Sequence, residues 1–151
     1  MEENKNPTPK PHHLQPNASN LIPKKMLSLD AFSQWLGIEI VEVQEGYCKV
    51  QMQIRKEMLN SMKKAHGGIT YSLADTAFGF ATNTMGRKAV SIDTSINHIE
   101  ALEEGDLLVA TSQLKSMKNK LAFYTVEIHV KDELVALFKG VAYRTSAVWE
   151  D

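Results

Sequence analysis

The chain is short, ordinary in composition and nearly neutral. Its 151 residues suit one domain, 43% of them are hydrophobic and 23% charged, and the formal net charge is −1. These values exclude a strongly basic surface of the kind that binds nucleic acid or an anionic membrane. The single cysteine, Cys48, cannot form an intramolecular disulfide, and no apolar run approaches the length of a membrane span. We therefore expect a cytoplasmic protein without nucleic-acid or membrane partners.

Residues 1–24 are predicted to be a disordered or flexible N-terminal tail. All five prolines of the chain lie within residues 1–23, among several Asn, Lys and His residues. A segment of this composition cannot bury enough apolar surface to offset the conformational entropy lost on folding. The folded part is therefore predicted to be a single domain at residues 25–151.

A short amphipathic helix is expected to open the domain. Ser28 is a suitable N-cap and Gly37 a suitable end, so the helix is predicted over residues 29–36. Its apolar residues are Leu29, Phe32, Trp35 and Leu36.

Two strands are predicted next, at residues 38–43 and 47–55, with a turn at residues 45–46 between them. Side chains of the second strand alternate between apolar and polar, so one face points to the core. Cys48 falls on that face and is predicted to be a packing residue, not a catalytic thiol. The inward positions are Cys48, Val50, Met52 and Ile54.

Residues 67–84 are predicted to form the main helix, which Gly86 ends. One side of this helix is an apolar stripe that includes Ile69, Leu73 and Phe80. The other side carries small residues that suit close approach by another element, so we expect the helix to be covered on nearly every side. These small residues are Ser72, Thr76, Gly79 and Asn83.

One acidic residue stands in this otherwise uncharged helix. Between His66 and Arg87 there is no Lys, Arg or Glu, and Asp75 is the only formal charge. An ionised carboxylate near a packed surface is costly unless it is hydrogen-bonded or takes part in chemistry. Asp75 is therefore a candidate catalytic residue, and the alternative is an interface residue that bonds to a partner's backbone.

Four further strands are predicted at residues 89–99, 106–117, 120–130 and 134–145. Turn-forming residues separate them. Two strands, one long buried helix and an antiparallel meander make an α+β domain in which the sheet wraps around one helix.

Five short motifs occur along residues 28–146 in a recognisable order. They are N-x5-H-G-G at residues 60–68, L-A-D-T-A-F at 73–78, V-S-I-D at 90–93, L-A-F at 121–123 and V-A-L-F-K-G at 135–140. The set resembles the hotdog-fold acyl-CoA thioesterases of the PaaI-like, phenylacetate-pathway type. The pairing of H-G-G with L-A-D at this spacing is its most specific part.

This resemblance implies a hotdog fold, in which an antiparallel sheet wraps around a long central helix. It implies homodimers with one continuous sheet, which commonly associate into tetramers. The implied activity is hydrolysis of acyl-CoA to free acid and CoA, with CoA as part of the substrate and with no metal or other cofactor. The alternatives are a non-catalytic acyl-CoA binding or sensing module on the same fold, and a hotdog dehydratase, whose surrounding motif is not found.

The resemblance also implies roles for single residues. Asp75 would be the general base or nucleophile, and the backbone N–H of Gly67 would bind the thioester oxygen. Asn60 and His66 would shape the site, and Ser91 would orient the attacking water. Three of these have structural alternatives: Asn60 can hold its own loop, His66 can cap the helix, and Ser91 can simply fill a strand position.

The phosphates of CoA call for basic groups near the mouth of the site. Many relatives read F-L-R-P after the V-S-I-D strand, where residues 96–99 here read I-N-H-I, so the usual basic contact is missing and CoA is expected to be held differently. His98 and His129 are predicted to be exposed or hydrogen-bonded strand residues without a catalytic role. The candidates for substrate and CoA contacts are Gly68, Arg87, Lys88, Lys118 and Lys120.

The spacing of Gly67 and Asp75 carries a prediction about assembly. They are eight residues apart on one helix, which is about 12 Å along its axis. Reacting groups must lie about 3 Å from a shared atom. The two cannot serve one thioester within a subunit, so we expect an obligate dimer in which different subunits supply them. Acyl specificity stays open, because Tyr71, Phe78 and Met62 either line the pocket or belong to the core.

Overall fold

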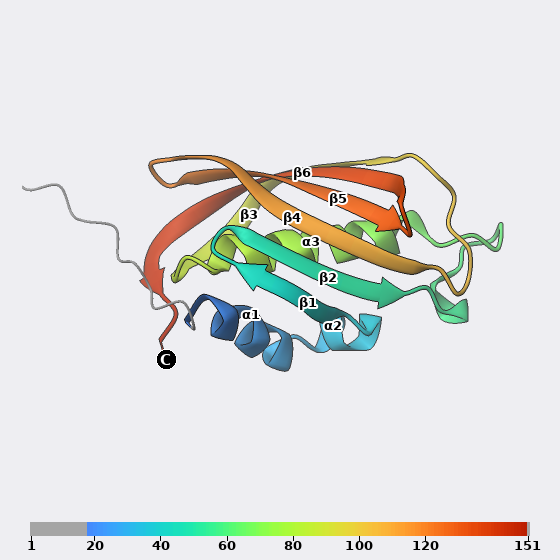
Figure 1. Cartoon of the computed structure of the whole chain (residues 1–151), viewed down its shortest axis with the longest axis horizontal. Coiled ribbons are helices and arrows are strands. Elements are labelled where there is room, and N and C mark those ends of the chain that lie inside the picture. The colour runs from blue at the N-terminus through green and yellow to red at the C-terminus, as the bar shows by residue number, and fades with distance from the viewer. Residues whose placement is uncertain (1–17, 151) are drawn as a thin grey trace, which may run out of the picture.

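Six strands and one long helix make up the body of the molecule. The computed structural model describes residues 18–150 (Figure 1). The strands are β1 (Glu39–Gln44), β2 (Tyr47–Gln53), β3 (Arg87–His98), β4 (Leu107–Lys118), β5 (Leu121–Val130) and β6 (Glu133–Val148). The helices are α1 (Ala18–Leu29), α2 (Ala31–Leu36), the 3-10 turn η1 (Lys56–Met58) and α3 (Gly67–Asn83).

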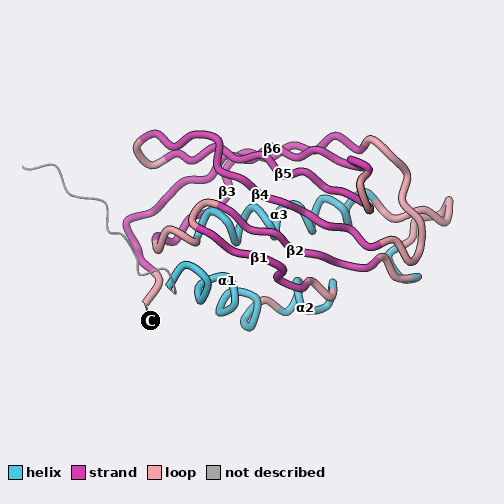
Figure 2. Tube along the Cα trace, in the orientation of Figure 1, coloured by secondary structure: helices cyan, strands magenta, loops and turns pink. Residues whose placement is uncertain are grey.

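All six strands form one antiparallel sheet in the order β1-β2-β4-β5-β6-β3. The sheet curves around α3, and α1 packs beside β1 and α3 (Figures 1 and 2). The bounds lie close to those predicted, and the predicted α+β architecture is confirmed. None of the helices within residues 18–150 has the length and apolarity to cross a membrane.

The core lies between α3 and the concave face of the sheet. Cys48 and Val50 of β2 are fully buried there, as their alternation predicts. Burial raises the pKa of the Cys48 thiol to about 12, so the thiol stays neutral. A neutral, buried thiol is a packing group, which agrees with the predicted role.

An aromatic cluster joins α3 to the central strands. The ring of Phe78 lies 5.5 Å from that of Tyr124 on β5 and 5.7 Å from that of Phe138 on β6, centroid to centroid. These distances are within the favourable range for tilted and edge-to-face pairs. The cluster therefore fixes the middle of α3, where Asp75 also lies, against the sheet.

One face of α3 remains open. No atom lies within 4 Å of the position that a Cβ would take on Gly79. By contrast, Asn83 is buried, and the Thr76 hydroxyl lies 3.3 Å from that of Ser33 on α2. The predicted cover is thus only partial within this chain on the face of Asp75 and Gly79, which are neighbours at i and i+4, whereas no residue from 69 to 83 is fully exposed. The physical reason is that the sheet is open, with edges at β1 and β3, and does not close around the helix.

Strand β3 forms an edge of the sheet, and within residues 18–150 its only neighbour in the sheet is β6. Its Val90 and Ile92 are 55% and 58% exposed. An edge strand offers a row of unpaired backbone N–H and C=O groups to any other strand. This edge and the open face of α3 are the two surfaces that a partner could complete.

The predicted boundary of the tail at residue 24 falls inside α1. Ile22 and Pro23 are buried, and Met26 and Leu27 pack against the core. Ile22 and Met26 are four positions apart, so both lie on one side of the helix. They supply apolar surface, which the predicted tail was expected to lack. Residues 1–17 and 151 lie outside the described residues.

The predicted first helix differs in its start. Its N-cap is Asp30, whose carboxylate accepts a hydrogen bond of 3.0 Å from the Ser33 N–H, and not Ser28. The Ser28 hydroxyl donates instead to the Lys25 carbonyl, near the end of α1. The predicted end is confirmed, because Gly37 adopts a left-handed conformation with φ of 74°.

The amphipathic side of α2 also differs from the prediction. Leu36 is fully buried, but Phe32 and Trp35 are 53% and 51% exposed and stack on each other. Leu29 is exposed at the end of α1. Ser33 takes the inward position, since its hydroxyl bonds to Asp30 and contacts α3. The predicted apolar side was wrong because Ser33 and Leu36, three positions apart, face inward, and Phe32 and Trp35 do not.

We expect the contact between Gly140 and Phe78 to limit substitution in the core. A Cβ on Gly140 would lie 2.8 Å from the Cζ atom of Phe78, which is itself 1% exposed. Gly140→Ala should therefore lower the free energy of unfolding by about 1–3 kcal/mol, measured by urea denaturation. Phe78→Leu makes room for the new methyl group, so the two changes together should cost less than their sum. Strict additivity would contradict the contact.

Candidate active site

The N-terminus of α3 presents one free backbone N–H. His66 is the N-cap: its Nδ1 accepts a hydrogen bond of 2.9 Å from the Gly68 N–H, and its carbonyl accepts one of 2.9 Å from Ile69. Within residues 18–150 no acceptor is bonded to the N–H of Gly67. The cap therefore leaves the Gly67 N–H exposed at the positive end of the helix dipole.

This arrangement shows how the His66 ring and the Gly68 N–H are used within the chain. As an acceptor, His66 Nδ1 carries no proton, so a neutral ring holds its proton on Nε2. His66 therefore caps the helix, and its expected part in shaping the site stays a prediction. The N–H of Gly68, an expected substrate contact, is occupied by the cap and is not free to bind substrate.

Asn60 holds the loop that leads to α3. Its Oδ1 accepts hydrogen bonds from the Met62 and Lys64 N–H groups, of 2.9 and 3.2 Å, and its own N–H donates to the Lys64 carbonyl. The side-chain oxygen is therefore used within the loop, which agrees with the alternative that Asn60 holds its own loop. The loop is tied to the rest of the chain by the Ala65 N–H, which donates to the Leu102 carbonyl at 2.8 Å.

Asp75 lies in the middle of α3 on the open face of the helix. Its side chain is half-buried, and burial raises the pKa of its carboxyl above the ordinary value. Within residues 18–150 the carboxylate has neither a hydrogen-bond partner nor an ion-pair partner. An unpaired carboxylate of this kind is able to accept a proton or attack an electrophile.

The structure does not bring Asp75 and Gly67 together. Both belong to the regular helix α3, so their separation along its axis is about 12 Å. The premise of the predicted shared site, that one helix carries both groups, therefore holds.

Ser91 lies on β3, opposite Ala142 of β6. Directly opposite residues in an antiparallel pair share a face of the sheet, and Ala142 belongs to the core on the side of α3. Ser91 therefore lies on the helix side of the sheet, exposed at the open edge of β3.

The predicted basic residues gather at the end of the sheet near the C-terminus of α3. Lys118 and Lys120 flank the β4–β5 turn, and the Lys120 carbonyl accepts a hydrogen bond from the Arg144 N–H. Partial burial lowers the pKa of the Arg144 guanidinium, and the nearby charge of Arg87, the first residue of β3, lowers it further. Lys88 instead lies over the Trp149 ring, with its Nζ 5.2 Å from the centroid.

Arg144 was not among the predicted contacts. Its Nε is buried without a partner, and one terminal nitrogen faces the Met117 sulfur. Side chains alternate along β6, so Arg144 lies on the same side of the sheet as Ala142. This alternation is the sequence signal from which the position of Arg144 was predictable. A guanidinium without a carboxylate partner adds positive charge to the cluster of Arg87, Lys118 and Lys120.

His98 was predicted to have no role at the site, yet it lies against the start of α3. A Cβ on Gly67 would lie 3.1 Å from His98 Nε2 and 3.4 Å from its Cε1. The contact joins the last residue of β3 to the first residue of α3, 31 positions apart in the chain. No local pattern could reveal it, because it depends on how β3 pairs with β6.

Of the three residues considered for the acyl pocket, Phe78 belongs to the core. The Tyr71 hydroxyl contacts the Thr94 hydroxyl, and its ring lies 5.6 Å from that of Phe138, so it is held at the edge of the core. Met62 is 75% exposed in the loop before α3.

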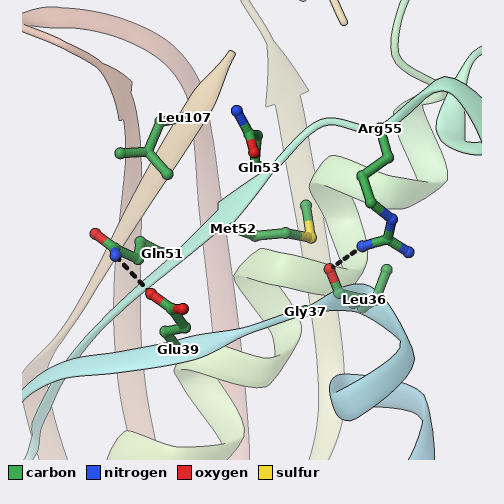
Figure 3. A pocket seen from close by; sticks show the side chains of 8 residues that line it. All are labelled: Leu36, Gly37, Glu39, Gln51, Met52, Gln53, Arg55 and Leu107. Carbon is green, nitrogen blue, oxygen red and sulfur yellow. Dashed lines mark hydrogen bonds between the residues drawn. The ribbon is translucent and has the colours of Figure 1, made fainter. Parts of the chain in front are cut away.

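A cavity of about 310 Å³ opens beside the C-terminus of α2 (Figure 3). Arg55 there donates hydrogen bonds to the carbonyls of Trp35 and Leu36, which places a cation at the negative end of a helix. The cavity holds none of the predicted site residues, and we assign its charged group to helix capping. Within residues 18–150, no three His, Cys, Asp or Glu side chains form a metal-binding group. The cavity is lined by Leu36, Gly37, Glu39, Gln51, Met52, Gln53, Arg55 and Leu107.

Known proteins share this sequence and this fold. The sequence profile of the Thioesterase superfamily matches residues 62–137. A putative esterase of Archaeoglobus fulgidus is 41% identical over 122 residues, which are 80% of this chain and 79% of that protein. The acyl-coenzyme A thioesterase PaaI of Escherichia coli is 38% identical over 120 residues, 79% of this chain and 86% of that protein. The solved structure of E. coli PaaI, from the phenylacetic acid degradation operon, superposes with a TM-score of 0.85 over 87% of this chain and 96% of that one, at 34% identity.

The cap geometry predicts how α3 responds to changes at His66. His66→Ala removes the acceptor of the Gly68 N–H and should cost about 0.5–2 kcal/mol of stability. His66→Asn replaces it with a favoured N-cap residue and should retain most of the stability. Urea denaturation of the three proteins measures both effects. Equal stability of all three would contradict the capping role.

Proposed function

Because this chain belongs to the thioesterase superfamily, we propose that it hydrolyses acyl-coenzyme A to a free acid and coenzyme A. This membership confirms the hotdog fold and the PaaI-like resemblance expected from the sequence. The name of the E. coli relative, an acyl-coenzyme A thioesterase, supports the substrate class. The observation that carries the proposal is the pair of unsatisfied groups on α3, the free N–H of Gly67 and the unpaired carboxylate of Asp75.

In the proposed chemistry the two groups have different tasks: one stabilises the carbonyl oxygen, and the other provides or activates the nucleophile. The N–H of Gly67 binds the thioester carbonyl oxygen and stabilises the negative charge that develops on it. The Asp75 carboxylate either takes a proton from the attacking water or attacks the carbonyl carbon itself. In both routes the C–S bond breaks, the thiolate of coenzyme A takes up a proton, and water supplies the oxygen of the released acid. Gly67 has no side chain to block the approach of the thioester.

We propose that two subunits complete each site. A gap of about 12 Å along α3 is too long for one subunit to supply both groups to one thioester. The open face of α3 and the unpaired edge of β3 support a dimer that joins β3 to β3 and brings the Asp75 face of one helix to the Gly67 end of the other. The exposed Val90 and Ile92 supply apolar surface for that contact.

Other residues have supporting roles in this proposal. Ser91, on the helix side of the β3 edge, orients the attacking water. His66 and Asn60 act through structure, because the one caps α3 and the other holds its loop. Arg87, Lys118 and Lys120 attract the phosphates of coenzyme A, and the guanidinium of Arg144, which forms no ion pair within residues 18–150, adds to their charge.

A thiol-release assay tests the proposed function directly. The purified protein should release free thiol from at least one of acetyl-, medium-chain, long-chain and aromatic acyl-CoA. Binding of acyl-CoA without release of thiol would instead favour a sensing module. Formation of a double bond without thiol would favour a dehydratase.

Asp75→Asn should lower kcat by about 10²- to 10⁴-fold, because the amide can neither accept the proton nor attack the carbonyl. In the unchanged protein, kcat/KM should rise with pH through the raised pKa of Asp75, above the ordinary value of 3.8, and then level off. Near-normal turnover in the variant would overturn the assignment.

The same change should stabilise the folded protein at neutral pH. A raised folded-state pKa means that folding favours the protonated carboxyl, so the ionised form carries a penalty that is absent below the unfolded pKa and appears as the pH rises through the folded pKa. Asp75→Asn removes this penalty and should raise the melting temperature at pH 7 but not at pH 3. A lower melting temperature at pH 7 would mean that a partner pairs with the carboxylate.

Mixed dimers test whether the site is shared. Gly67→Pro deletes the free N–H at the first helical position, where proline is tolerated, and His66 already has the extended conformation (φ −63°, ψ 132°) that precedes proline. Gly67→Ala adds a Cβ but keeps the N–H, so its activity shows how much of the loss comes from the Cβ, which would lie close to His98 Nε2. When inactive Asp75→Asn and Gly67→Pro proteins are unfolded, mixed equally and refolded, half of the dimers are mixed and each has one intact site. About one quarter of wild-type activity should return. No recovery, with mixed dimers verified by mass, would place both groups in one subunit.

A further inference from the structure

We propose that His98 supplies a second hydrogen-bond donor to the thioester carbonyl oxygen, through Nε2, beside the N–H of Gly67. This inference rests on the proposed function and extends it to a residue that the site motifs do not include. It makes His98 a catalytic residue, since its ring would touch the reacting oxygen.

The first support is the position of the imidazole. A Cβ on Gly67 would lie 3.1 Å from His98 Nε2, closer than from Cε1 or Cδ2, at 3.4 and 3.8 Å. Nε2 is thus the ring atom that lies nearest to the position of a Cβ on Gly67. Glycine leaves room here for the ring as well as for the substrate, because a Cβ would be in tight contact with Nε2 unless the exposed ring shifted.

The second support is the distance between the two donors. A Cβ is about 2.5 Å from the backbone nitrogen of its own residue, so His98 Nε2 lies no more than about 5.6 Å from the Gly67 nitrogen. An oxygen placed about 2.9 Å from each of two donors can bridge nitrogens up to about 5.8 Å apart. One carbonyl oxygen can therefore accept from both groups at once.

The third support is that His98 is held in place but has no partner. It pairs with Ala136 at the end of the β3–β6 ladder, and the next residue, Ile99, donates to the Val135 carbonyl at 2.9 Å. Within residues 18–150 no hydrogen bond involves the His98 ring, and the side chain is exposed. A fixed backbone with an unpaired donor suits a preorganised contact to a bound ligand.

The chemistry of this role needs no proton transfer from His98. As the attacking oxygen bonds to the carbonyl carbon, the carbonyl π electrons move to its oxygen, and Nε2–H and the Gly67 N–H stabilise the charge. When the C–S bond breaks, these electrons return to form the carbonyl of the product and the thiolate leaves. Both the neutral Nε2–H tautomer and the imidazolium donate from Nε2.

Steady-state kinetics of His98 variants test the proposal. His98→Ala should lower kcat by about 10²-fold with KM little changed, because the lost contact is strongest in the transition state. His98→Gln keeps a side-chain N–H donor and should recover part of the loss. His129→Ala on β5 is the matched control and should leave kcat unchanged. A kcat for His98→Ala within twofold of wild type, or an effect on KM alone, would overturn the proposal.

Ligand binding tests His98 separately from the reaction. Two unreactive ligands are compared by calorimetry: a ketone analogue in which CH₂ replaces the thioester sulfur, and an S-alkyl-CoA thioether without a carbonyl. His98→Ala should weaken binding of the ketone by about tenfold and leave the thioether unchanged. Equal effects on both ligands would overturn the role of His98. If the wild type released no thiol, the proposed function would fail. The comparison of the two ligands would still show whether His98 contacts the carbonyl oxygen.

Discussion

The rise of α3 keeps the two groups needed for the proposed chemistry apart. Gly67 and Asp75 belong to one regular helix, and a helix has no freedom to bring residues eight positions apart onto one atom. The gap of about 12 Å along the axis persists in every rotamer of Asp75. The open face of α3 and the unpaired edge of β3 fit a site that a second copy completes. A rigid helix in each subunit would then hold both groups of each site at fixed positions, because neither depends on a mobile loop.

Several groups on and around this helix lack hydrogen-bond partners or packing neighbours, which lowers the stability of the folded chain. Within residues 18–150 the Asp75 carboxylate is half-buried without a partner, the Gly67 N–H is unpaired, and Gly79 faces open space. Buried side chains such as Asn83 are satisfied, since Asn83 bonds to the backbone of Ala89 and to the Trp149 indole, and the exceptions among the described residues are the Ser112 hydroxyl and Arg144 Nε. Unsatisfied polar groups cost stability, so their concentration on one face marks the candidate site. In the cavity beside α2, by contrast, the Gln51 amide donates a hydrogen bond to Glu39, and Arg55 donates one to the Leu36 carbonyl (Figure 3).

The first two backbone N–H groups of α3 have different uses: one takes part in the helix cap, and the other is free for the proposed ligand. His66 takes the N–H of Gly68 and stabilises the helix, and the N–H of Gly67 remains. The ring of His98 then limits which residues can occupy position 67. The glycine pair of the H-G-G motif therefore has two different duties. The N–H of the second glycine serves the cap, and the first glycine leaves room for the His98 ring and for the proposed ligand.

The sequence by itself determined the features that depend on neighbours in the chain. Alternation predicted the strands and the buried face of β2, and the uncharged run around Asp75 located the long helix and its acid. The known rise of a helix led to the proposal of a shared site. Only the tertiary structure decided that His98 lies on Gly67, that the half-buried Arg144 lies near Arg87, and that Phe32 points outward. It also placed helix α1 across the predicted end of the tail, because Ile22 has apolar surface to pack against only once β1 and α3 are in place. These features depend on the pairing of distant strands and on the rotation of short helices. A local sequence pattern determines neither of them, because both are fixed only when the chain packs.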